Sequence, residues 1–454
     1  MILVRRFVDR VFPRGALILS ILSFGYFAAG IVRNRILATE FGAGAELDAY
    51  NAAFRIPEIA LDILVASGLS APFVPIFSRL LGHDDPAGRA AAEEFGQTIL
   101  TGAVAVMTVA VVLLFIFAPW IADTVWRDFD PSTKALYVNL LRINCVAQVM
   151  FAASNTVGDV LVVHRRFLLY GLAPIAYTTG IVIGAILLGP SIGIYGPAIG
   201  AVGGATGHLA IRIIGGRQVG FRIRPSVRFR TSAFREFFRL MLPRMASYPI
   251  DPIVVSFMTV LAVALGPGTA SALSYVLDYQ FVPIQVIAIA FSLAVFPVLS
   301  RAYADGDGEA FRRILVRNVV TIGGLTVLAA IVLAILARPL VSILLGGGRF
   351  GPDAVALTSG LLLAFTISIP IDALSYPLSR ALYATHNTIW QVTASITGLA
   401  TLVVASQILV PAMGVGGIAV GYAIGGAAKI AILTIAVVRR VRPIGRGRTD
   451  VPAV

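Results

Sequence analysis

Residues 47–80 read LDAYNAAFRIPEIALDILVASGLSAPFVPIFSRL, an apolar run that carries charges in its first half. The charged residues follow one another at spacings of seven, three and four residues: Asp48, Arg55, Glu58 and Asp62. On an α-helix these intervals place all four side chains on one stripe. An ionised side chain at mid-bilayer costs roughly 2.5–3.5 kcal/mol, so such a stripe has to face water or protein. The run therefore predicts a membrane helix that keeps a charged surface for a polar ligand.

The composition of the rest of the chain is also that of a membrane protein. Of 454 residues, 58% are hydrophobic and only 13% are charged. A membrane-spanning helix needs about 20 apolar residues, and about twelve such runs are present, at 15–38, 47–80, 92–119, 133–160, 166–189, 194–214, 236–265, 268–300, 312–337, 353–384, 388–410 and 413–438. We therefore expect an all-α polytopic membrane protein with about 12 transmembrane helices.

The positive charge is distributed in a way that predicts topology. The formal net charge of +13 could suggest nucleic acid, but the arginines concentrate in the leader, the tail and alternate loops. One such loop region, 212–239, carries Arg212, Arg217, Arg222, Arg224, Arg228, Arg230, Arg235 and Arg239. This is the positive-inside pattern, which predicts that both termini face the cytoplasm. The basic loop is then a topology signal first and a contact for anionic lipid second, and nucleic acid is excluded as a partner.

Two similar stretches indicate an internal duplication. Phe73-Val-Pro-Ile-Phe-Ser-Arg79 ends the second span and Val295-Phe-Pro-Val-Leu-Ser-Arg301 ends the eighth, 222 residues later. Six spans per repeat give the two halves the same orientation in the membrane. The predicted organisation is an N-terminal six-helix lobe, a basic cytoplasmic linker, a pseudo-symmetric C-terminal six-helix lobe and a basic cytoplasmic tail, at 1–214, 215–235, 236–440 and 441–454.

Cofactor and metal chemistry find no support in the sequence. Cys145 is the single cysteine and lies within an apolar span, and the four histidines have no metal-ligand spacing. The glycine-rich stretches Gly193–Gly207 and Gly414–Gly426 follow no strand, so they do not predict a nucleotide site. They predict close helix packing instead.

Several motifs resemble one family over nearly the whole chain. These are Arg33-Asn-Arg-Ile-Leu-Ala-Thr-Glu-Phe-Gly-Ala-Gly44, Asp48-Ala-Tyr50, Ala53-Phe-Arg-Ile-Pro57, the two repeated stretches, and Gly348-Arg-Phe-Gly351. They resemble the MurJ/MviN family of lipid II flippases, within the multidrug/oligosaccharidyl-lipid/polysaccharide exporter superfamily.

The resemblance implies a flippase rather than an enzyme. The protein would export a polyprenyl-diphosphate-linked peptidoglycan precursor from the inner to the outer leaflet of the bacterial plasma membrane by alternating access. The implied partners are the lipid-linked glycan and membrane lipids, with no cofactor, and the cell-wall synthesis machinery stays open as a protein partner. Two alternatives also stay open: export of another lipid-linked oligosaccharide, and multidrug antiport.

The resemblance also implies a binding site. In that family, cationic residues of the first lobe hold the pyrophosphate of the substrate, and the matching positions here are Arg33, Asp48 and Arg55. Arginine presents a planar fork that suits diphosphate oxygens. We expect the carboxylates of Glu58 and Asp62 to keep Arg55 charged and aligned while the site is empty.

The resemblance is not complete, and it leaves ion coupling open. Phe27 and Leu61 stand at positions where the family usually has arginine. Asp251, Asp278 and Asp372 are acidic residues within second-lobe spans. They are candidates for proton or cation coupling; polar packing beside prolines is the alternative.

Overall fold

The computed structural model describes residues 14–82, 85–247, 250–385 and 389–441. The basic leader and the predicted tail beyond Val441 lie outside these ranges. Within them the regular secondary structure is helical, apart from an isolated bridge between Gly347 and Phe350. The all-α class is therefore confirmed.

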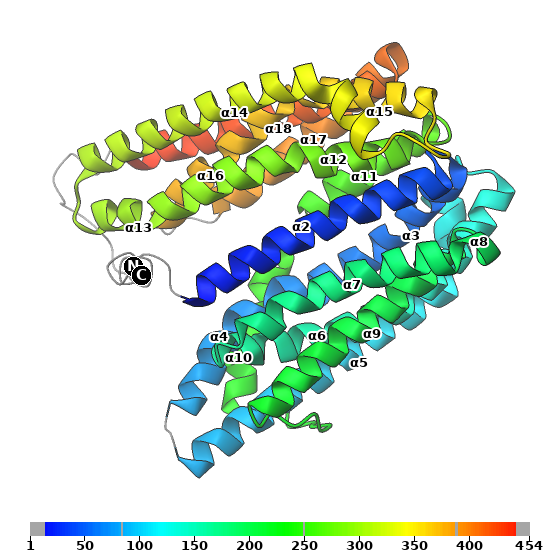
Figure 1. Ribbon diagram of the computed structural model, residues 1–454. Helices are drawn as coiled ribbons and strands as arrows, with labels where there is room; N and C mark the ends of the chain where they lie inside the picture. The colour runs from blue at the N-terminus through cyan, green and yellow to red at the C-terminus, as the bar shows by residue number, and fades with distance from the viewer. Residues whose placement is uncertain (1–13, 83–84, 248–249, 386–388, 442–454) are drawn as a thin grey trace, which may run out of the picture. The chain divides into compact units, whose positions relative to one another are not determined.

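The chain divides into two compact units, and the first contains the charged run. It comprises Met1–Ile253 together with the short segment Leu344–Phe350. Its elements are α2 (Arg14–Phe41), α3 (Ala45–Leu61), the π-helical turn η1 (Asp62–Ala66), α4 (Ser67–Leu81), α5 (Pro86–Thr124), α6 (Pro131–Val163), α7 (Phe167–Leu187), α8 (Gly189–Ile192), α9 (Tyr195–Gln218) and α10 (Ser232–Ser247). In this unit α2 packs on α7, α3 packs on α6, and both α6 and α7 pack on α9 (Figure 1).

The second unit comprises Val254–Ile343 and Gly351–Val454. Helix α11 (Ile250–Ala264) crosses from the first unit into it. The remaining elements are α12 (Thr269–Pro283), the π-helical turn η2 (Ile284–Ile289), α13 (Ala290–Ala304), α14 (Gly308–Leu344), α15 (Pro352–Phe365), α16 (Ser368–Ala384), α17 (Ile389–Met413) and α18 (Val415–Val441). Helix α18 packs on both α16 and α17.

The predicted spans correspond to these helices. Over the described residues, eight helices are long and apolar enough to cross a membrane, or nine if the bent pair α15 and α16 is one span. The other predicted ranges fall on α2, on α3–η1–α4 and on α10–α11. The seventh range, 236–265, falls on two helices: α10, which carries Arg235, Glu236 and Arg239, and the apolar α11.

The predicted duplication has a structural counterpart. The Phe73–Arg79 and Val295–Arg301 stretches lie near the ends of α4 and α13. Each of these helices is preceded by a π-helical turn, η1 from Asp62 and η2 from Ile284, and these starts are again 222 residues apart. A π turn widens the helix by one residue and shifts the face that later residues present.

Aspartate–proline pairs begin two long helices. Asp85 caps α5 by accepting a hydrogen bond from the Gly88 amide, and Pro86 is the first helical residue. Asp130 caps α6 in the same way ahead of Pro131. Such caps satisfy amides that have no intrahelical acceptor, and proline has no amide to satisfy. Hydrogen bonds from Ser132 and Thr133 hold the pKa of the Asp130 carboxyl well below its usual range.

Glycines let α7 and α9 approach at backbone distance. A Cβ atom at Gly180 or Gly184 would overlap the backbone of Gly200 and its neighbours, and a Cβ at Gly204 would overlap the Tyr177 carbonyl. The prediction that the Gly193–Gly207 stretch serves helix packing is confirmed, as it is for Gly414–Gly426, where Gly417, Gly421 and Gly425 meet α17 in the same way.

The segment Leu344–Phe350 docks on the turn between α2 and α3. The Arg349 amide donates to the Thr39 carbonyl at 2.8 Å, and Arg349 Nη1 lies 3.6 Å from Glu46 Oε2. Two glycines make this fit possible. Gly42 has φ +69° and would carry its Cβ 2.7 Å from the Arg349 carbonyl oxygen, while Gly348 has φ +55° and would overlap the Thr39 carbonyl.

We predict that Gly348→Ala undocks this segment. Alanine at positive φ costs about 1–2 kcal/mol, and the overlap with Thr39 adds a similar amount. Hydrogen exchange of the Arg349 amide should therefore accelerate by roughly 30-fold or more, because at least about 2 kcal/mol of protection is lost. Gly351→Ala is the matched control, since Gly351 has φ −73° and nothing within 4 Å of its Cβ position. Unchanged exchange in Gly348→Ala would contradict the prediction.

Candidate functional site

The candidate site lies on the α2–α3 hairpin of the first unit. Helix α2 ends at Phe41, Gly42 makes a left-handed turn, and α3 begins at Ala45. Asp48 lies in the first turn of α3 and is only 1% exposed. The partial positive charge at a helix N-terminus stabilises a carboxylate there.

Arg33 and Glu58 lie within electrostatic range of two tyrosines. The half-buried Arg33 donates from Nε and Nη2 to Asn34 Oδ1 at 3.0 and 2.8 Å. Both Arg33 and Glu58 interact electrostatically with Tyr50 and with Tyr177. The structure therefore brings together predicted residues from α2 and α3 with a tyrosine from α7.

Arg55 has a different environment. It is half-buried on α3, its Nε atom is inaccessible, and that atom has no hydrogen-bond partner among the described residues. The expected alignment of Arg55 by Glu58 and Asp62 does not take the form of an ion pair, because no described carboxylate pairs with Arg55. Asp62 instead begins the η1 turn, one residue after α3 ends. The guanidinium is left with donors for an external anion.

Sequence reasoning missed the two tyrosines. Tyr50 is 5% exposed and lies against Phe54, with ring centroids 4.7 Å apart. Tyr177 meets the Phe151 ring edge-on at 4.9 Å, and its carbonyl lies against Gly204. Tyr50 lies inside the charged run and could have been found there. No spacing marks Tyr177, because α7 reaches the site only through tertiary packing.

Arg212 lies elsewhere than predicted. The sequence placed it in a basic cytoplasmic loop, but α9 continues to Gln218 and buries Arg212 to 5% exposure. Its Nη1 donates to the Ser154 carbonyl at 2.9 Å and its guanidinium stacks over Tyr170. Gly158 leaves room for it, since a Cβ there would overlap the guanidinium. The positive charge is buried because α6 supplies acceptors that the sequence pattern does not reveal.

The three acidic candidates for ion coupling differ in exposure. Asp251 on α11 and Asp278 on α12 are exposed. Asp372 on α16 is half-buried and accepts a hydrogen bond from the Tyr422 hydroxyl on α18. The hydrogen bond from Tyr422 therefore links Asp372 to another apolar helix, α18.

Comparison with known proteins agrees with this architecture. A lipid II flippase MurJ from Burkholderia cenocepacia is 23% identical over 422 residues, covering 90% of this chain and 81% of that protein. A solved lipid II flippase MurJ in an inward closed conformation matches with a TM-score of 0.79 at 20% identity, covering 94% of this chain and 90% of the other. A multidrug resistance MATE family transporter in an inward-facing conformation matches with a TM-score of 0.75 at 12% identity, covering 93% and 96%.

At these identities the solved structures establish the fold alone: a multi-pass helical membrane protein of the type shared by MurJ and MATE transporters. The family is established by sequence. The lipid II flippase MurJ family model matches residues 37–449, which is most of the chain and includes all of the charged helix α3. The protein therefore belongs to the lipid II flippase MurJ family.

Proposed function

We propose that this protein exports lipid II, a polyprenyl-diphosphate-linked peptidoglycan precursor, from the inner to the outer leaflet of the bacterial plasma membrane. The observation that carries the proposal is the environment of the Arg55 guanidinium. A half-buried guanidinium on a membrane helix, with no carboxylate partner among the described residues, is costly unless an anion binds it for part of the cycle. A diphosphate supplies that anion in the geometry that arginine prefers.

The proposed headgroup site is the α2–α3 hairpin with Tyr177 of α7. Arg55 and Arg33 would bind diphosphate oxygens, and the Tyr50 and Tyr177 hydroxyls would donate to the same group or to the sugar. The negative charge of Glu58 would offset the positive charge of Arg33. Asp48 lies in the first turn of α3, and Asp62 directly follows its last residue. The polyprenyl chain would stay in the lipid while the headgroup crosses.

The mechanism we propose is alternating access by two lobes of like orientation. The positive-inside pattern predicts that both termini face the cytoplasm, and we propose that the headgroup binds from that side. An inside-negative potential helps an anion outward by about 2.3 kcal/mol per charge per 100 mV.

Depolarising proteoliposomes should therefore slow export severalfold or more, measured with fluorescent lipid II. An export rate that does not change with the membrane potential would contradict the electrophoretic contribution.

Asp372 is our proposed coupling carboxylate. If cation or proton binding at Asp372 drives the cycle, Asp372→Asn should lower gradient-driven flipping by roughly tenfold and remove its dependence on pH or sodium. Asp278→Asn is the matched control, because Asp278 is exposed. Equal gradient dependence in Asp372→Asn and wild type would rule out coupling through this residue.

Complementation tests the proposed function directly. The chain should restore growth to bacterial cells depleted of their own lipid II flippase, and Arg55→Ala should not. Purified protein should then flip lipid II in proteoliposomes. A chain that expresses normally but neither rescues growth nor flips lipid II would overturn the proposal; raised drug tolerance without rescue would identify a multidrug antiporter.

A further inference from the structure

The linker between α9 and α10 is fastened along α5. The Arg222 amide donates to Glu93 Oε1 at 3.3 Å, and the Gln97 side chain donates to the Arg222 carbonyl at 2.9 Å. Farther along, the Ser226 amide donates to Thr101 Oγ1 at 2.9 Å. The linker therefore has a fixed register on the helix.

This register brings the linker to the level of the membrane surface. Phe221 packs at Gly96 of α5, while Phe229 reaches Gly102. Glu94 is the last charged residue of α5 before its long apolar run, and Gly102 lies about 12 Å farther along the axis at 1.5 Å per residue. The end of the linker thus lies where α5 passes from charged to apolar sequence.

Helix α10 follows the linker and exposes both apolar and cationic side chains on its outer face. Its inner face packs on α4 and α5 through Phe237, which is 3% exposed. Its outer face carries Arg235, Phe238, Arg239 and Leu242, at helical spacings of three, one and three residues. Phe238 and Leu242 are 46% and 54% exposed. A helix face that exposes apolar and cationic side chains together is typical of one lying in a bilayer interface.

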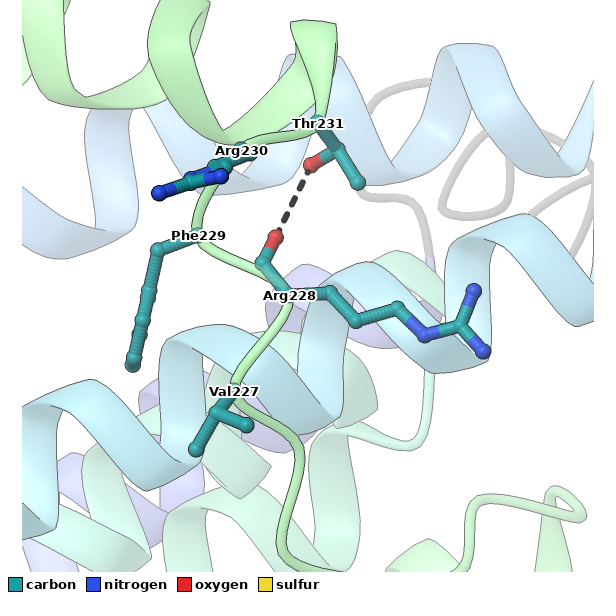
Figure 2. A pocket seen from close by; sticks show the side chains of 5 residues that line it. All are labelled: Val227, Arg228, Phe229, Arg230 and Thr231. Carbon is teal, nitrogen blue, oxygen red and sulfur yellow. Dashed lines mark hydrogen bonds between the residues drawn. The ribbon is translucent and has the colours of Figure 1, made fainter.

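The end of the linker also combines apolar and cationic side chains. Residues Val227–Thr231 line a shallow hollow of about 470 Å³ (Figure 2). Phe229 and Arg230 extend to the same side of the backbone there, while Arg228 extends to the other side (Figure 2) and lies 3.2 Å from Glu94. The Phe229 ring meets the Phe234 ring of α10 at 5.1 Å, so linker and helix form one surface.

Charge on this surface is unbalanced. Arg79 and Arg228 of the same region pair with Glu236 and Glu94. Over the described part of the chain, Arg230, Arg235 and Arg239 have no carboxylate partner.

We propose that Arg230, Arg235 and Arg239, with Phe229, Phe238 and Leu242, form a docking surface for anionic phospholipid headgroups of the inner leaflet. This surface is separate from the headgroup site on α2 and α3, and its lipid is bound, not transported. The apolar side chains enter the interface while the guanidiniums bind phosphate. Each arginine near an anionic surface contributes about fivefold to affinity.

The test compares two double variants of the full-length protein. Binding of phosphatidylglycerol is measured by native mass spectrometry and by its effect on the thermal midpoint, against phosphatidylcholine. Arg235→Gln/Arg239→Gln should weaken phosphatidylglycerol binding on the order of twentyfold. Its thermal midpoint in phosphatidylcholine should not change, because both side chains are exposed.

The matched control removes the same charge from the second unit. Arg312 and Arg317 are exposed on α14, and Arg312→Gln/Arg317→Gln should bind phosphatidylglycerol nearly as wild type does. Equal binding by wild type and Arg235→Gln/Arg239→Gln would overturn the proposal, as would an equal loss in the control. A stabilisation reproduced by inorganic phosphate at the same concentration would also overturn it, since the surface would then bind a free anion.

Discussion

Arg55→Ala is expected to reduce lipid II flipping by roughly 30-fold or more, because truncating one partner of a buried charge pair costs about 2–5 kcal/mol. In the empty protein the Arg55 guanidinium has no described carboxylate partner, so its pair forms only with the substrate. The measurement is the initial rate of flipping in proteoliposomes, with growth of depleted cells as an independent readout.

Thermal stability separates this role from a structural one. If Arg55 only held the fold, its removal would lower the thermal midpoint; an unpaired half-buried charge predicts an unchanged or higher midpoint. Arg55→Lys should recover part of the rate, because it restores charge without the planar fork. Arg35→Ala is the control, since Arg35 is exposed on α2 and should keep nearly full activity. Full flipping by a well-expressed Arg55→Ala would refute the cationic site.

Gly204→Ala is expected to have the second largest effect, by separating α7 from α9. Its new methyl group would overlap the Tyr177 carbonyl, so the two backbones have to move apart. Overpacking of this kind costs about 1–3 kcal/mol, which should lower the thermal midpoint by several degrees. Because Tyr177 belongs to the proposed site, flipping should also fall on the order of tenfold to a hundredfold.

The neighbouring glycine provides the control for Gly204→Ala. Gly203 lies on the same helix with nothing within 4 Å of its Cβ position. Gly203→Ala should be neutral or slightly stabilising, because alanine favours the helix. If the two variants unfold at the same temperature, backbone contact between α7 and α9 is not what stabilises the pair.

Much of the fold could be predicted from local sequence. Apolar runs such as 92–119 and 312–337 correspond to α5 and α14 because hydrocarbon leaves a spanning backbone little choice but the helix. The repeat between 73–79 and 295–301 was also visible in the sequence, because the two stretches have similar residues at matching positions. What could not be predicted was the pair of π turns at Asp62 and Ile284, since a one-residue widening leaves no mark on hydrophobic periodicity.

The candidate site could be predicted only in part. Asp48, Arg55 and Glu58 were identifiable because charge in an apolar helix is costly. The position of Tyr177 within electrostatic range of Arg33 and Glu58 was not, since it depends on α7 packing beside α2. Arg212 was misplaced for a related reason: a positive charge near a predicted loop looks exposed, whereas acceptors on α6 allow α9 to bury it.

The sequence by itself determined that this chain spans a membrane many times, that similar stretches recur 222 residues apart, and to which family it belongs, because these follow from residue type and order along one dimension. Only the tertiary structure decided which charges remain without a partner. Whether a guanidinium has acceptors depends on groups that are distant in sequence, such as Ser154, which lies 58 residues before Arg212. Arg212 has such groups on α6, whereas Arg55 Nε has no hydrogen-bond partner in the described part of the chain.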